Sequence, residues 1–267
     1  YIDMTKEKIL KVLEEEKIDF RLLLTDKGEQ FSLRFGEKEK MFDFETFANE
    51  KEVYERISLP WKIANGRMDS EQIKKWLSNY ENVKDKLSIR LVRKVSSSSL
   101  AVKIYDFYLE VYVQISPVSV ALTKESIREW KVTAIEVFKQ AEENIKYLSI
   151  VYKSTNDMLY ELTGTRDKRN SGLYVLKYDR ETFGGAILMN EYILHMVSKS
   201  LGGEFYILPC SVDEILVMRS EKGSGEELQR QMKDIIRNIN DSAVKEDMRL
   251  SYHLFKYLPE NRKLIVY

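Results

Sequence analysis

The stretch over residues 172–220 constrains the fold more than any other, because three kinds of segment follow one another there with clear boundaries. A run of Tyr, Val and Leu predicts a strand, and a helical pattern that stops at two glycines predicts a helix. Two apolar runs around a short polar connection then predict a hairpin. These segments are the strand Tyr174–Tyr178, the helix Gly185–Leu201 and the hairpin strands Phe205–Leu208 and Ile215–Met218.

The other predicted strands also form adjacent groups that single helices separate. The expected helices are Thr5–Glu16, Asp69–Tyr80, Thr123–Ile145, Asn156–Leu162 and Glu226–Ile239. The expected strands are Phe20–Thr25, Gln30–Phe35, Lys40–Phe44, Leu87–Val95, Leu100–Ile115, Met248–Tyr257 and Arg262–Tyr267. Both halves of the chain then consist of a helix followed by strands. This grouping favours an α+β fold, with antiparallel sheets and packed helices, over a doubly wound parallel sheet.

Helical spacing also predicts which side chains are buried. The segment Thr123–Ile145 carries one apolar stripe over about six turns and should nucleate the core of the second half. The other predicted stripes are Ile73, Trp76, Leu77 and Tyr80; Met189, Ile193, Met196, Val197 and Leu201; and Leu228, Met232, Ile235, Ile236 and Ile239.

The run Ser96–Ser99 indicates a boundary between the two halves. It predicts an N-terminal α+β half over residues 1–95 and a C-terminal α+β domain over residues 100–267. Four residues are short for a tether between domains, so a surface loop inside one continuous domain is an equally good interpretation.

Composition excludes several classes of protein. The 43 basic residues balance the 43 acidic ones, so nucleic acid is not a favoured partner. No apolar run approaches the ~20 residues that a membrane helix needs, so no membrane partner is expected. The single cysteine, Cys210, excludes an internal disulfide, and a cytoplasmic location fits best.

The sequence lacks the residue patterns that the common metal sites and enzyme active sites require. With one cysteine and two histidines, His195 and His253, no zinc pattern can be written, and neither a metal nor a cofactor is expected. Glycine-rich phosphate loops and the nucleophile-elbow motif do not occur. His195 and His253 are interpreted as packing or surface residues. Cys210 follows a strand, where its thiol would be exposed, but no activating group adjoins it in sequence.

One part of the chain resembles known sequences. The segments Thr155–Gly164, Leu173–Leu176, Gly184–Met189 and Phe205–Val217 are similar to two related bacterial families of unknown function. They share the pattern Leu-Pro-x-Ser-x-x-Glu, which begins here at Leu208. The resemblance covers roughly residues 105–267, whereas about the first 95 residues match only in general order. Related sequences often carry Ser at position 210 and His at position 213, so no catalytic residue is carried over.

Three hypotheses about function follow. The favoured one is a protein that binds another protein without catalysis, because charge is balanced, 16 tyrosines are present and no catalytic set is assembled. Its candidate contact residues are Cys210, Asp213 and Glu214. The second is a hydrolase in which Asp213 and Glu214 converge with other acids on a divalent ion. The third is a small-ligand sensor with a pocket between the halves.

Overall fold

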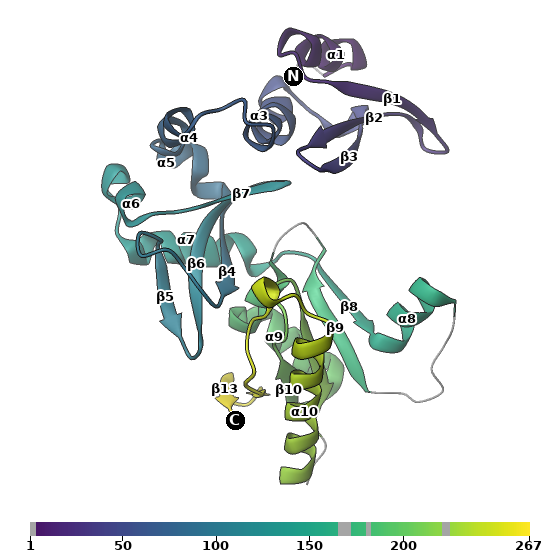
Figure 1. Ribbon diagram of the computed structural model, residues 1–267, viewed down its shortest axis with the longest axis vertical. Helices are drawn as coiled ribbons and strands as arrows, with labels where there is room; N and C mark the ends of the chain where they lie inside the picture. The colour runs from purple at the N-terminus through teal and green to yellow at the C-terminus, as the bar shows by residue number, and fades with distance from the viewer. Residues whose placement is uncertain (1–3, 165–171, 180–182, 221–224) are drawn as a thin grey trace. The chain divides into compact units, whose positions relative to one another are not determined.

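A computed structural model describes residues 4–164, 172–179, 183–220 and 225–267 of the chain (Figure 1). The helices and strands form an α+β fold with three antiparallel sheets, which confirms the predicted class. The chain divides into two compact units. Unit 1 comprises the chain up to Val83 together with Val113–Val120, and unit 2 comprises Lys84–Tyr112 together with Ala121–Tyr267. The run Ser96–Ser99 lies inside unit 2, and a domain boundary at this run stays a prediction.

Unit 1 begins with helix α1 and a three-stranded meander in the order β1-β2-β3. Short helical segments follow the meander. The elements are α1 (Lys6–Glu15), β1 (Phe20–Thr25), β2 (Gly28–Phe35), β3 (Lys38–Asp43), η1 (Phe44–Thr46), α2 (Glu50–Val53), η2 (Tyr54–Ser58), α3 (Leu59–Ala64), α4 (Ser70–Leu77) and α5 (Tyr80–Val83). Thr5 caps α1 by accepting a hydrogen bond from the Lys8 amide, and the expected turn at Asp26-Lys27 joins β1 to β2.

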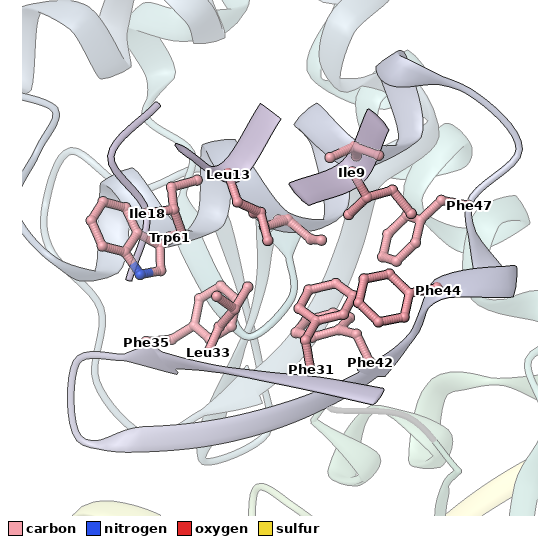
Figure 2. Close-up of a cluster of buried hydrophobic side chains, with 12 residues drawn as sticks. Ile9, Leu13, Ile18, Phe31, Leu33, Phe35, Phe42, Phe44, Phe47 and Trp61 are labelled. Atoms are coloured by element: carbon pink, nitrogen blue, oxygen red, sulfur yellow. The ribbon is translucent and has the colours of Figure 1, made fainter. Parts of the chain in front are cut away.

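An aromatic core holds unit 1 together (Figure 2). Ile9 and Leu13 of α1 lie over rings from β2, β3 and η1. Phe31 stacks on Phe42 of the neighbouring strand with ring centroids 5.4 Å apart, and Phe44 lies 4.7 Å from Phe31. Aromatic pairs at these separations stabilise a fold beyond the area that they bury. The meander therefore needs its helical cover to be stable.

The helix α4 has the predicted start but a smaller buried face than the stripe predicts. Asp69 and Gln72 form the capping box, with hydrogen bonds of 2.8 and 3.0 Å between side chain and backbone. Leu77 is buried, whereas Ile73 and Trp76 are half-buried. The prediction of a fully buried stripe is wrong here, because a helix of two turns covers only a small part of the core.

Unit 2 contains most of a four-stranded sheet in the order β4-β6-β5, to which β7 adds beside β6. The strands are β4 (Leu87–Val92), β5 (Ala101–Ile104), β6 (Phe107–Ile115) and β7 (Val118–Ala121). The single strand expected over Leu100–Ile115 is in fact the hairpin of β5 and β6. Ile104 pairs with Phe107 across a turn in which Tyr105 has φ 53°, so the turn interrupts an apolar run that contains no glycine.

The long helix expected over Thr123–Ile145 is two helices, α6 (Lys124–Trp130) and α7 (Ala134–Lys146). Lys131 ends α6 in the left-handed conformation, with φ 56°. Thr133 and Glu136 then form a capping box that starts α7, with the Glu136 carboxylate accepting from the Thr133 amide at 2.7 Å. The apolar stripe continues across this break, which is why periodicity alone missed it.

The larger sheet of unit 2 has the order β13-β12-β10-β11-β9-β8, and all its neighbouring strands are antiparallel. Its helices and strands are β8 (Ile150–Ser154), α8 (Thr155–Thr163), β9 (Leu173–Tyr178), η4 (Gly184–Met189), α9 (Glu191–Leu201), β10 (Phe205–Leu208), β11 (Ile215–Arg219), α10 (Glu226–Ser242), η5 (Glu246–Met248), β12 (Phe255–Leu258) and β13 (Lys263–Val266). The predicted pairing of β10 with β11 is confirmed. Strand β8 was not predicted.

Both faces of strand β10 in this sheet are covered. Tyr206 and Leu208 pack with Met232 and Ile236 of α10, which crosses one face (Figure 1). The alternate residues of β10, such as Ile207, are also buried. A strand that is buried on both faces has a continuous apolar sequence, as the run Phe205–Leu208 does.

Two side chains of the stripe predicted for the helix Gly185–Leu201 do not point inward. Met189 is 37 % exposed and Met196 is 48 % exposed, whereas Ile193, Val197 and Leu201 are buried as expected. Asn190 caps α9, so Met189 precedes the helix and does not continue its stripe.

The basic segment Thr165–Ser171 and the glycine-containing turn at Gly223-Ser224 lie outside the described residues. Within the described residues, no helix has both the length and the apolar character that a membrane span requires.

Candidate functional site

Cys210 lies in the core of unit 2, next to Tyr206, Met232 and Ile236. The expectation of an exposed thiol is wrong, since the residue is 3 % exposed. Burial, together with the nearby Glu214 carboxylate, raises the pKa of the Cys210 thiol to about 12. The thiol therefore stays protonated and is neither a nucleophile nor a surface contact in this conformation.

The connection from Pro209 to Glu214 is held mainly through its backbone. The Leu250 amide donates to the Cys210 carbonyl at 3.0 Å, and the Val212 amide donates to the Met248 carbonyl at 2.9 Å. The Gly185 amide donates to the Val212 carbonyl at 2.9 Å. A Cβ on Gly185 would lie 2.9 Å from the carbonyl oxygens of both Ser211 and Val212, so a side chain has no room there. The Leu-Pro-x-Ser-x-x-Glu segment therefore has a clear packing role.

The two predicted acidic contacts do not form a metal site. Asp213 is exposed and Glu214 is half-buried. Among the residues that the structure describes, no three His, Cys, Asp or Glu side chains lie close enough to hold a metal ion together. The described residues thus do not form the carboxylate cluster that the hydrolase hypothesis requires.

A half-enclosed groove of about 620 Å³ lies within unit 2. Its lining comes from Ile89 of β4, the last turns of α7, the end of η4, the exposed side of α9 and Arg262 before β13. This volume is in the range of known ligand pockets. No sequence motif marks the groove, because its residues come from five separate segments.

Asn190 fixes the two helices that form the groove. Its Oδ1 accepts from the Ile193 amide at 3.2 Å and so caps α9, while its Nδ2 donates to the Ile145 carbonyl of α7 at 3.1 Å. The same Nδ2 donates to the Tyr178 hydroxyl at 3.3 Å. Burial raises the pKa of Tyr178 to about 12 despite this hydrogen bond. A buried polar network therefore sets the spacing of α7 and α9.

Large side chains stand exposed around the groove. Met189, Tyr192 and Met196 line it with exposed fractions of 37 %, 44 % and 48 %. Tyr147, which is 66 % exposed, packs against Tyr192 in a T-shaped contact with ring centroids 4.8 Å apart. His195, which was interpreted as a packing or surface residue, also lines the groove, and its Nδ1 is buried without a hydrogen-bond partner in the described part of the chain.

The charges along the groove balance. Glu143 pairs with Lys146 at 3.0 Å, and Glu191 pairs with Arg262 at 2.8 Å. The hydrogen bond that Lys146 donates to the Glu143 carboxylate raises the pKa of this lysine, which therefore stays charged.

No curated protein and no solved structure matches the chain significantly. A family model does match, over residues 39–258, and thus extends well into the N-terminal part that was expected to match only in general order. With a match of this length, the chain belongs to the family of unknown function DUF5688.

Proposed function

We propose that this protein is a non-enzymatic protein-interaction module, and that the groove between α7 and α9 binds a segment of a partner protein. The observation that carries this proposal is the exposure of Tyr147, Met189, Tyr192 and Met196 around one hollow. Tyrosine and methionine are enriched in protein interfaces, because tyrosine combines a large apolar face with a polar tip and methionine adapts its shape. An apolar segment of a partner is therefore the proposed occupant.

The charged residues that line the groove indicate which charges the partner segment should carry. Glu142 and Lys199 line it and form no ion pair within the described residues, unlike Glu143 and Glu191. A partner segment with apolar anchors, one basic residue and one acidic residue would complement both charges. Such charges contribute more to specificity and association rate than to affinity.

The test starts from affinity capture of the tagged protein in a lysate of its own cells. The captured protein is then purified, and its dissociation constant is measured by calorimetry for the wild type and for two groove variants, Tyr192→Ala and Met196→Asp. Loss of a central interface side chain commonly weakens binding by about tenfold or more. The matched control is Ile135→Asp, because Ile135 lies on α7, is 67 % exposed and does not line the groove.

Binding that weakens in both groove variants and not in the control supports the proposal. Equal dissociation constants for all four proteins overturn it. The prediction that Asp213 and Glu214 contact a partner is tested in the same way, with the variants Asp213→Ala and Glu214→Ala. Cys210 is left out of this set, because its buried side chain would change the fold before it changed an interface.

A further inference from the structure

Strand β1 forms one edge of the sheet in unit 1, and Arg21 is its only charged residue. Proteins usually block an edge strand with charged residues, proline or a bulge. Strand β3, at the other edge, carries Lys38, Glu39 and Lys40. Strand β1 instead has three consecutive leucines, Leu22, Leu23 and Leu24, which are 54 %, 36 % and 84 % exposed.

The register of the hairpin shows which backbone groups face outward. Thr25 pairs with Gly28 across the two-residue turn, and in such a hairpin the closing pair exchanges hydrogen bonds. Bonded pairs then alternate along the strand, so Leu23 bonds to β2, whereas the amides and carbonyls of Leu22 and Leu24 point away from it. The two most exposed leucines thus stand where the outward backbone groups are. An edge of this kind recognises an extended strand with apolar side chains.

We propose that β1 pairs in antiparallel orientation with β1 of a second copy of this chain. A two-fold axis normal to the sheet places the same face of both copies on the same side of the joined sheet. Odd-numbered residues of one copy therefore lie opposite odd-numbered residues of the other, and even-numbered residues opposite even-numbered ones. With the axis at Leu23, Leu22 lies opposite Leu24 of the second copy, and Leu23 lies opposite itself. The outward groups of Leu22 and Leu24 then exchange hydrogen bonds across the axis, and the leucines cover one another on both faces.

Charge complementarity selects this register. With the axis at Leu23, Asp19 of each copy, just before β1, comes next to Lys27 in the turn that follows β1 of the other copy. Both residues are exposed, and neither forms an ion pair within the described residues. A register shifted by two residues in one direction brings Arg21 next to Lys27, and the two positive charges repel each other. A shift in the other direction places Asp19 opposite Thr25, so the Asp19 carboxylate has no positive charge facing it. Opposite charges at facing positions stabilise a strand pair, whereas like charges destabilise it.

The first test is the molar mass of the full chain by analytical ultracentrifugation over a range of concentrations. The wild type should dimerise reversibly. Leu24→Lys should be monomeric where the wild type is dimeric, because a charged residue blocks the edge. Met41→Lys is the matched control, since Met41 is 52 % exposed on β3 at the other edge. Circular dichroism should show that both variants keep their fold. A monomeric wild type, or a Leu24→Lys protein that still dimerises, overturns the proposal.

The second test is a charge swap that addresses the register. Asp19→Lys alone places two lysines opposite each other at both ends of the strand pair, and Lys27→Asp alone places two aspartates there. Each variant should dimerise about tenfold more weakly than the wild type. An equimolar mixture of the two should form a heterodimer with the affinity of the wild type, because lysine then faces aspartate at both ends. A mixture that associates no better than the separate variants rules out this pairing.

Discussion

Gly184 packs against the backbone of Asp213, and a Cβ added to Gly184 would collide with the Asp213 carbonyl oxygen. The same Cβ would lie 2.9 Å from Cβ of Lys177 on β9. The Asp213 oxygen is a backbone atom and the Lys177 Cβ is bonded directly to the backbone, so neither atom can move away at low cost. This contact explains why a glycine pair precedes the Leu-Pro-x-Ser-x-x-Glu segment: the two segments touch through their backbones.

Gly184→Ala should therefore destabilise the protein by about 2 kcal/mol or more, through overpacking of backbone on backbone. The matched control is Gly225→Ala, because a Cβ at Gly225 meets nothing within 4 Å and its φ is −87°. The control should cost less than about 1 kcal/mol, through the weaker cap at the start of α10. Urea unfolding followed by circular dichroism measures both, and equal costs would contradict the close contact.

Glu110 and Arg90 form an ion pair inside unit 2 that should be costly to break. The Glu110 side chain is 4 % exposed, and its Oε2 lies 2.7 Å from Nε of Arg90. The Arg90 guanidinium also lies 5.1 Å from the centre of the Phe183 ring. Glu110→Ala should lower the free energy of unfolding by about 3 kcal/mol, because the arginine loses its partner in a desolvated site.

Replacing both members of this pair is the informative control. The double variant Arg90→Met, Glu110→Leu fills similar volume without charge and should recover most of the lost stability. A double variant that is as unstable as Glu110→Ala would show that packing, and not the unpaired charge, causes the loss. Thermal unfolding of the three proteins at one pH decides between these causes.

Tyr178 should make stability fall at high pH. The folded-state pKa of about 12 is raised above the ordinary value of 10.0, chiefly by burial. This contribution to stability is complete below pH 10 and is lost as pH rises from 10 to 12, because the unfolded chain ionises first. Over this range the wild type should lose about 2 to 3 kcal/mol more than Tyr178→Phe.

Below pH 10 the wild type should be more stable than Tyr178→Phe. Tyr178→Phe should then be less stable by about 1 kcal/mol, since it removes the hydrogen bond from Asn190. Urea unfolding at pH 8, 10 and 11.5 gives the free energies for both proteins. Free-energy curves that run parallel over this pH range would show that the hydroxyl is not buried.

Cys210 should resist thiol reagents in the native protein. With a pKa of about 12 in place of 9.0, the thiolate fraction at pH 8 falls roughly a thousandfold. Labelling with iodoacetamide should therefore be slow in buffer and become rapid in urea concentrations that unfold the chain. Fast labelling of the folded protein, at the rate of a free thiol peptide, would place Cys210 at the surface.

Local chemistry along the chain predicted most elements correctly. The cap at Thr5, the capping box at Asp69, the turn at Asp26-Lys27 and the apolar run Phe205–Leu208 each depend on residues close together in sequence. The helix over Thr123–Ile145 was mispredicted although Thr133 and Glu136 form a capping box, because the apolar residues keep helical spacing across the break. The antiparallel α+β class follows from the order of these elements.

The candidate site was the least predictable part. Sequence reasoning singled out Cys210, Asp213 and Glu214, whereas the groove between α7 and α9 has no motif. No pattern in the sequence singles out Tyr192, and Met196 was predicted to be buried. The only available signal was that Met196 follows Tyr192 by one helical turn, which places both on one side of α9.

The sequence by itself determined the capped starts of α1 and α4, the turn that joins β1 to β2, and the antiparallel α+β class. Only the tertiary structure decided that Cys210 is buried, that burial raises the pKa of Tyr178 to about 12, that Asn190 joins two helices, and that β1 is an edge strand. The physical reason is that capping, turn formation and periodicity act between neighbours in the chain. Burial, desolvation and strand order depend on segments that are distant in sequence and meet only in the folded protein.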